Sequence, residues 1–103
     1  MNPVLHGIEV PQGEIERFCA RNHVRTLSLF GSILTERFRP DSDVDVVVEF
    51  EPDAAVTYLD LARMEQELST VIGRKIDLRT PQELSRYFRE RVLTEALLQY
   101  GRK

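Results

Sequence analysis

Apolar and polar positions alternate along this chain with two different periods, and each period predicts a different kind of element. Apolar residues spaced by three or four predict amphipathic helices, whereas short apolar runs with period two predict strands. The predicted helices cover residues 11–22, 33–38, 57–72 and 81–100, and the predicted strands cover residues 24–30, 43–50 and 75–79. Residues 1–10 show no clear period, so we expect a loose leading segment.

Particular residues mark where these elements begin and end. Gly31 interrupts the first strand, and Ser32 is suited to cap the short helix that follows. The stretch 39–42 has the composition of a turn, and Thr80 begins a capping-box pattern for the last helix. That helix is expected to turn four apolar residues inward: Leu84, Phe88, Val92 and Ala96.

The order of elements predicts an α/β fold. A long helix lies between the strands at 43–50 and 75–79, which is typical of a crossover between parallel strands. We therefore expect a small mixed β-sheet flanked by about four helices. The length of 103 residues fits a single domain over residues 1–103.

Composition narrows the class of protein. Hydrophobic residues make up 42% and charged residues 30%, which is typical of a folded globular chain. The net charge of -3 argues against direct nucleic-acid binding, and Cys19 as the only cysteine excludes an internal disulfide. No apolar run is long enough to span a membrane and no signal-peptide pattern is present, so we expect a cytoplasmic protein.

Asp43 and Asp45 are separated by one residue on a predicted strand, so both side chains point to the same face. Their Cα atoms would lie about 6.5–7 Å apart. Carboxylates this close repel each other unless a cation lies between them, and Mg²⁺ is such a cation. The simpler interpretation is that both acids merely begin a surface strand. A Ca²⁺ loop of the EF-hand type is excluded, because Val46 and Pro52 occupy its glycine and glutamate positions.

Two further features have both a structural and a functional interpretation. The Gly31-Ser32 pair is either an ordinary turn or a place where backbone N–H groups receive phosphate, although the common P-loop and Gly-x-Gly-x-x-Gly motifs are absent. Asp77 is either a third carboxylate of a metal site or an exposed residue paired with Lys75 or Arg79.

Together these motifs are far more specific than any one of them. Gly31-Ser32, ten intervening residues, Asp43 and Asp45, and then Asp77 on a later strand resemble the signature of the DNA polymerase beta-like nucleotidyltransferase superfamily. The surrounding sequence is similar to the minimal nucleotidyltransferase (MNT) subfamily, whose members act as antitoxins of HEPN-domain toxins. The resemblance covers nearly the whole chain, from about residue 24 to the end of the last predicted helix.

The resemblance implies a Mg²⁺-dependent adenylyltransferase that moves AMP from ATP to a tyrosine of a HEPN-domain toxin and so neutralises it. It implies that Asp43, Asp45 and Asp77 are catalytic and hold two Mg²⁺ ions. Asp77 would also help to deprotonate the acceptor hydroxyl. Gly31 and Ser32 would cradle the phosphates of the nucleotide. Two ions in such a site stabilise the attacking and the leaving oxygens.

One departure from the family pattern keeps alternatives open. Many relatives continue Gly-Ser with an arginine-containing stretch, whereas this chain has Ile33-Leu34-Thr35-Glu36, and Arg37 or Arg39 are the candidates to replace the arginine. A non-catalytic module that neutralises its partner by contact is one alternative. The other is a homodimeric adenylyltransferase of a small molecule, in which the second subunit completes the acceptor pocket.

Overall fold

The computed structural model describes residues 4–101 and contains two sheets, three α-helices and two short 3-10 turns. The strands are β1 (Val4–Leu5), β2 (Ile8–Glu9), β3 (Val24–Phe30), β4 (Val44–Phe50), β5 (Ile76–Arg79) and β6 (Leu97–Tyr100). The helices are α1 (Gln12–Arg21), α2 (Tyr58–Ile72) and α3 (Arg89–Glu95), and the 3-10 turns are η1 (Gly31–Leu34) and η2 (Pro81–Glu83). No helix in this described part is both long and apolar enough to cross a bilayer.

The main sheet is mixed and has the strand order β5-β4-β3-β6. Strand β4 pairs antiparallel with β3 and parallel with β5, and α2 connects the two parallel strands. Strand β6 adds to the free edge of β3 in antiparallel orientation. The predicted α/β class, the mixed sheet and the parallel crossover are therefore confirmed.

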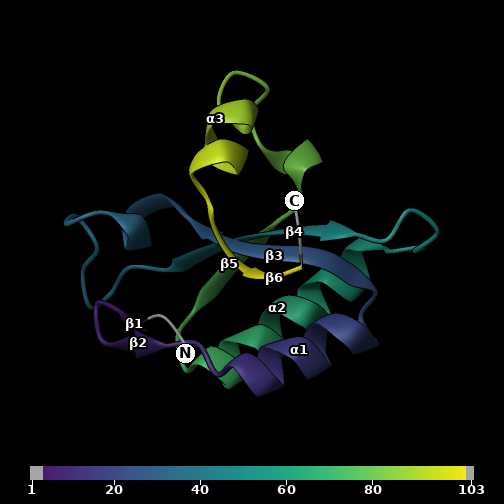
Figure 1. The fold of residues 1–103 in the computed structure, drawn as a ribbon, viewed down its shortest axis with the longest axis horizontal. Coiled ribbons are helices and arrows are strands. Elements are labelled where there is room, and N and C mark those ends of the chain that lie inside the picture. Colours follow the sequence, from purple (N-terminus) through teal and green to yellow (C-terminus); the bar gives the residue numbers. More distant parts are fainter. Residues whose placement is uncertain (1–3, 102–103) are drawn as a thin grey trace.

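Helices α1 and α2 cover one face of the sheet, as Figure 1 shows below the strands. The core lies between them, and alternation along each strand explains why. Val44, Val46 and Val48 of β4 are fully buried on this face. Phe18 of α1 and Leu68 of α2 pack against them with no exposed surface.

The other face of the sheet carries the polar residues of the same strands. Because side chains alternate, Asp45 and Glu49 of β4 lie on this face, together with Asp77 and Arg79 of β5. The segment that contains η2 and α3 lies on this side of the molecule in Figure 1. We call this side the open face of the sheet.

The central elements form where their end signals predict them. The side chain of Thr57 accepts a hydrogen bond from the backbone N–H of Asp60, and the side chain of Asp60 accepts one from the backbone N–H of Thr57, which completes a capping box. Gly73 ends α2 in the left-handed conformation, with φ of 80°. The predicted helices at 11–22 and 57–72 and the predicted strands at 24–30, 43–50 and 75–79 are confirmed to within one residue at each end.

The predicted helix over residues 81–100 is wrong. The capping box of Thr80 and Glu83 forms as predicted, but it begins only the single turn η2. The backbone of Leu84 is extended, and helical structure resumes only in α3. Strand β6 then pairs with β3, whose edge would otherwise leave its peptide groups without partners. Residues 4–101 thus contain three α-helices instead of about four.

Two smaller predictions also need correction. Of the predicted loose segment 1–10, residues 1–3 lie outside the described residues, whereas residues 4–9 form a hairpin of β1 and β2, closed by a two-residue turn with positive φ at His6 and Gly7. The helix predicted for 33–38 is only the one-turn η1, and Ser32 lies within this turn and does not cap it. Ile33 points into the core and is 1% exposed, which fixes the turn against the sheet.

Candidate functional site

Asp45 and Asp77 lie side by side on the open face, where the central strand β4 meets the edge strand β5. The parallel register places them directly opposite each other on β4 and β5. The backbones of neighbouring strands in a sheet lie about 4.8 Å apart. Asp43 immediately precedes β4, after a turn that Arg74 holds by donating to the carbonyl oxygens of Pro40 and Ser42 at 3.0 and 2.8 Å. The strand alternation and the turn therefore bring the three predicted carboxylates to one region.

The charge of Asp45 is unfavourable where it lies. Burial, and then the charges of Asp77 and Asp43, raise the pKa of Asp45 to about 6, and Arg79 opposes the shift. A carboxylate that is partly desolvated beside two others gains most from a bound cation. This electrostatic strain fits Asp45 as a ligand of a divalent metal such as Mg²⁺.

The backbone of Gly31 closes over Asp45. Gly31 has a φ of 78°, and a Cβ atom placed there would lie 3.2 Å from Cγ of Asp45 and closer still to Oδ2. Phe30, the residue before Gly31, is the cross-strand partner of Asp45. The glycine is therefore required both for its conformation and for the space that the carboxylate occupies.

Asp77 is held by its neighbour Arg79. The guanidinium donates from Nε to Oδ1 at 3.0 Å and from Nη2 to Oδ2 at 3.3 Å. The two interpretations of Asp77 from the sequence thus both have an observation in their favour: it is paired with Arg79, and it lies beside Asp45. Within residues 4–101 no three acidic, histidine or cysteine side chains are already arranged as a metal cage. The ligand roles of Asp43, Asp45 and Asp77 stay predictions.

A cavity of about 790 Å³ adjoins the Gly31-Ser32 turn. One side of it is apolar and comes from Phe88 and Val92 of the last segment. Arg37 and Arg91 bring two cations to its lining, whereas Arg39 lies outside it. The volume is that of a pocket for a small molecule, and the mixture of apolar and cationic walls suits a ligand with an aromatic part and an anionic part.

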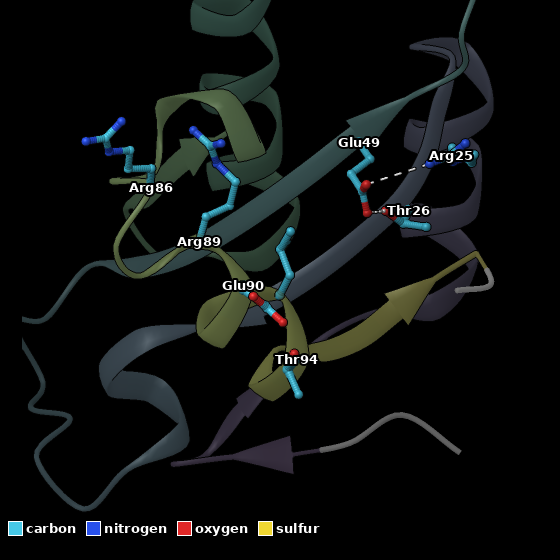
Figure 2. Close-up of a pocket in the computed structure, with 8 residues that line it drawn as sticks. Arg25, Thr26, Glu49, Arg86, Arg89, Glu90 and Thr94 are labelled. Atoms are coloured by element: carbon cyan, nitrogen blue, oxygen red, sulfur yellow. Dashed lines mark hydrogen bonds and ion pairs between the residues drawn. The ribbon is translucent and has the colours of Figure 1, made fainter.

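A second cavity, of about 650 Å³, lies on the other side of α3 (Figure 2). Its floor is Glu49, which accepts a hydrogen bond from Thr26 Oγ1 at 2.8 Å and lies 3.7 Å from the guanidinium of Arg25. Arg89 is engaged structurally, because it donates to the carbonyl oxygens of Pro81 and Leu84. Helix α3 thus separates two cavities on the open face, and only the first contains Gly31 and Ser32.

The sequence did not indicate the role of α3 in lining this site. The spacing of Leu84, Phe88 and Val92 was detected, but it was assigned to a buried helix face, whereas Phe88 is 60% exposed and all three line the cavity. Arg91 also lines this cavity, with 78% of its side chain exposed. The usable signal was an arginine directly beside this apolar stripe, three residues after Phe88.

Comparisons with known proteins agree on one family. The family described as "Nucleotidyltransferase domain" matches residues 13–99. A Methanocaldococcus jannaschii protein, provisionally named a protein adenylyltransferase, is 32% identical over 77 residues, which are 75% of this chain and 81% of that protein. The protein adenylyltransferase MntA of Thermococcus cleftensis is 31% identical over 74 residues, which are 72% of this chain and 73% of that protein.

Solved structures share the fold. A structure provisionally described as a minimal nucleotidyltransferase has a TM-score of 0.69 and 34% identity, covering 84% of this chain and 86% of that one. A complex from Shewanella oneidensis, of a tri-AMPylated HEPN toxin with an MNT antitoxin, matches with a TM-score of 0.63 and 19% identity over 88% of this chain and 70% of that one. The second match shows the fold alone. The chain belongs to the nucleotidyltransferase domain family.

Proposed function

We propose that this chain is a Mg²⁺-dependent protein adenylyltransferase that acts as an antitoxin. It transfers AMP from ATP to a tyrosine of a HEPN-domain toxin, as a single domain over residues 1–103. The names of the relatives at 31 and 32% identity support the reaction. The MNT antitoxin bound to a tri-AMPylated HEPN toxin, which has the same fold, supports the partner. An ATP donor makes the cytoplasm the expected compartment.

The observation that carries the proposal is Asp45. It lies beneath Gly31, beside Asp77 and close to Asp43, with its pKa raised to about 6. A carboxylate held in this way lowers the stability of the fold. A role in binding metal and nucleotide would explain why the chain keeps it there.

The residues divide the reaction between them. Asp43 and Asp45 hold the metal ions, and Gly31 and Ser32 face the phosphates. When bound, two Mg²⁺ ions supply positive charge to the attacking and leaving oxygens. The phenolic oxygen of the acceptor attacks the α-phosphorus, the bond to the bridging oxygen breaks, and pyrophosphate leaves. Asp77 takes the phenolic proton, and the two hydrogen bonds that Arg79 donates orient its carboxylate.

A second candidate is a contact-only antitoxin. The observation that favours it is the bidentate pair of Asp77 and Arg79, which occupies one of the three proposed ligands. In that case the nucleotidyltransferase fold is a scaffold, and the toxin is neutralised by binding alone. The two candidates differ in whether the partner is modified.

The experiment incubates this protein with Mg²⁺, ATP labelled at the α-phosphate and the purified HEPN-domain protein encoded beside it. Label is expected on the partner with the wild-type chain and absent with Asp45→Asn. The matched control is Glu49→Gln, which removes a carboxylate from the same strand and the same face outside the proposed site. Neutralisation of the partner without label, equally by the wild type and Asp45→Asn, would instead establish the contact-only antitoxin.

A further inference from the structure

Residues 33–36, directly after Gly31-Ser32, supply no positive charge for a triphosphate. Ile33 is buried in the core, and Glu36 adds a negative charge close to the turn. The turn η1 has only four residues, so few aligned peptide dipoles are available at its start. A bound triphosphate carries several negative charges, and these need cations from elsewhere in the chain.

Two arginines reach the cavity beside this turn from different parts of the chain. Arg37 follows η1 in sequence, and Arg91 comes from α3. Among the residues the structure describes, no carboxylate forms an ion pair with Arg37. Arg91 is paired only with Glu95, four residues later on the same helix, at 3.2 Å. This pair is exposed on both sides, and exposed pairs of this kind contribute little and exchange partners readily.

The geometry points to Arg91, assisted by Arg37, as the phosphate-binding cation of this enzyme, with Glu95 as the carboxylate that holds Arg91 until nucleotide arrives. Glu95 receives one hydrogen bond, from Nε of Arg91, whereas a phosphate can accept two parallel hydrogen bonds from a guanidinium, so the exchange favours phosphate. This inference rests on the proposed function. It identifies how the chain replaces the arginine that is absent after Ser32.

The apolar side of the same cavity, which comes from the segment that also carries Arg91, accounts for the rest of the nucleotide. Phe88 is 60% exposed and lines the cavity together with Leu84 and Val92. An exposed aromatic ring on an apolar wall offers a surface for a nucleobase to stack on. The anionic part of ATP would then lie toward Arg37, Arg91 and the Gly31 turn.

The test measures nucleotide binding by calorimetry on the full chain with Mg²⁺, so its readout is independent of transfer. Arg91→Ala is expected to weaken ATP binding about tenfold or more. Binding of AMP, which lacks the β- and γ-phosphates, should change less than about threefold by the same conversion. Arg91→Lys keeps the positive charge but loses the two parallel donors of the guanidinium, so its ATP affinity should lie between those of the wild type and Arg91→Ala. The matched control, Arg86→Ala, removes an arginine that lines the cavity on the other side of α3 and should leave ATP affinity unchanged.

Glu95→Gln tests the inference in the opposite direction, because it is expected to increase the affinity for ATP. It frees Arg91 and removes a negative charge from the cavity lining, so ATP should bind about two- to fivefold more tightly. Wild-type ATP affinity in Arg91→Ala, weaker binding in Glu95→Gln, or no ATP binding by the wild type would each overturn the inference. A wild-type chain that binds ATP through Arg91 but labels no partner would contradict only the proposed function.

Discussion

Gly31 and Asp45 lie so close together that a side chain at residue 31 would collide with the carboxylate of Asp45. A Cβ at Gly31 would lie 3.2 Å from Cγ and 3.4 Å from Cβ of Asp45, and closer to Oδ2. The carboxylate has to move aside if residue 31 has any side chain. Residue 31 therefore sets the position of Asp45 as well as the path of the chain after β3.

Gly31→Ala should damage activity more than stability. The displaced carboxylate is expected to lower AMP transfer about a hundredfold, as misplacement of a reacting group by about 1 Å does. The positive φ should cost about 1–2 kcal/mol of unfolding free energy. Transfer assays and urea denaturation measure the two effects.

Gly73→Ala is the control for this substitution. Gly73 has nearly the same φ, 80°, but no atom lies within 4 Å of the Cβ that alanine would add. It should lose a similar amount of stability and keep wild-type activity. Equal loss of activity in both variants would mean that Gly31 acts only through its backbone conformation.

The metal-free protein should become more stable when Asp45 loses its charge. The folded-state pKa of Asp45, about 6, is above its ordinary value of 3.8, so the native state binds the proton more tightly than the unfolded state. Stability from this group is therefore greatest below pH 4 and falls as pH rises through 6. At pH 7.5 in a chelator, Asp45→Asn should raise Tm by about 4 °C, corresponding to about 1 kcal/mol after allowance for partial solvent screening.

Two comparisons make that result specific. The gain from Asp45→Asn should shrink as pH is lowered from 7 to 4, and Asp53→Asn, in an exposed loop, should show none at any pH. Added Mg²⁺ should raise the Tm of the wild type and leave Asp45→Asn unchanged. A lower Tm for Asp45→Asn in the chelator would show that the carboxylate stabilises the fold and carries no electrostatic strain.

Patterns among residues close in sequence predicted α1, α2, β3, β4 and β5. Strand β6 instead depends on pairing with a distant part of the chain. Thr57 and Gly73 bracket α2 by interactions within a few residues, so the sequence alone located both ends. The pattern at Leu84, Phe88 and Val92 was equally clear, but a period of four does not say whether an apolar stripe enters the core or lines a cavity. Strand β6 forms because β3 offers an unpaired edge about seventy residues earlier in the chain, which no local pattern encodes.

In the candidate site, too, the sequence indicated some features, whereas others depend on contacts between distant parts of the chain. The neighbouring positions of Asp45 and Asp77 follow from strand alternation and the parallel crossover, both of which the sequence indicated. The contact between Gly31 and Asp45 depends on the register of β3 against β4. The placement of Arg91 in the same cavity lining as Ser32 depends on where the chain turns after η2, and the sequence predicted a continuous helix there.

The cap of α2 gives a prediction that concerns the scaffold alone. Thr57→Ala removes the side-chain acceptor for the backbone N–H of Asp60 and should cost about 1 kcal/mol. Thr70→Ala, which removes an exposed hydroxyl within the same helix, should cost less than about 0.5 kcal/mol. Chemical denaturation compares the two. Similar losses at both positions would mean that the capping box does not fix the start of α2.

Burial should make Cys19 inert. Its thiol is fully buried in α1 against the sheet, and burial raises its pKa to about 12, so almost no thiolate is present at neutral pH. We expect no alkylation by iodoacetamide in the native protein over hours and complete alkylation in urea. Rapid native alkylation, followed by mass, would show that α1 opens from the sheet under native conditions.

The central claim is that the carboxylate of Asp45 serves transfer of AMP to a tyrosine of the HEPN-domain partner. The most direct measurement is intact-mass and peptide mass spectrometry of that partner after incubation with Mg²⁺, ATP and each form of this protein. We expect added AMP units on tyrosine with the wild type and with Glu49→Gln, and an unmodified partner with Asp45→Asn. An unmodified partner with the wild type, or modification that persists in Asp45→Asn, would contradict the account.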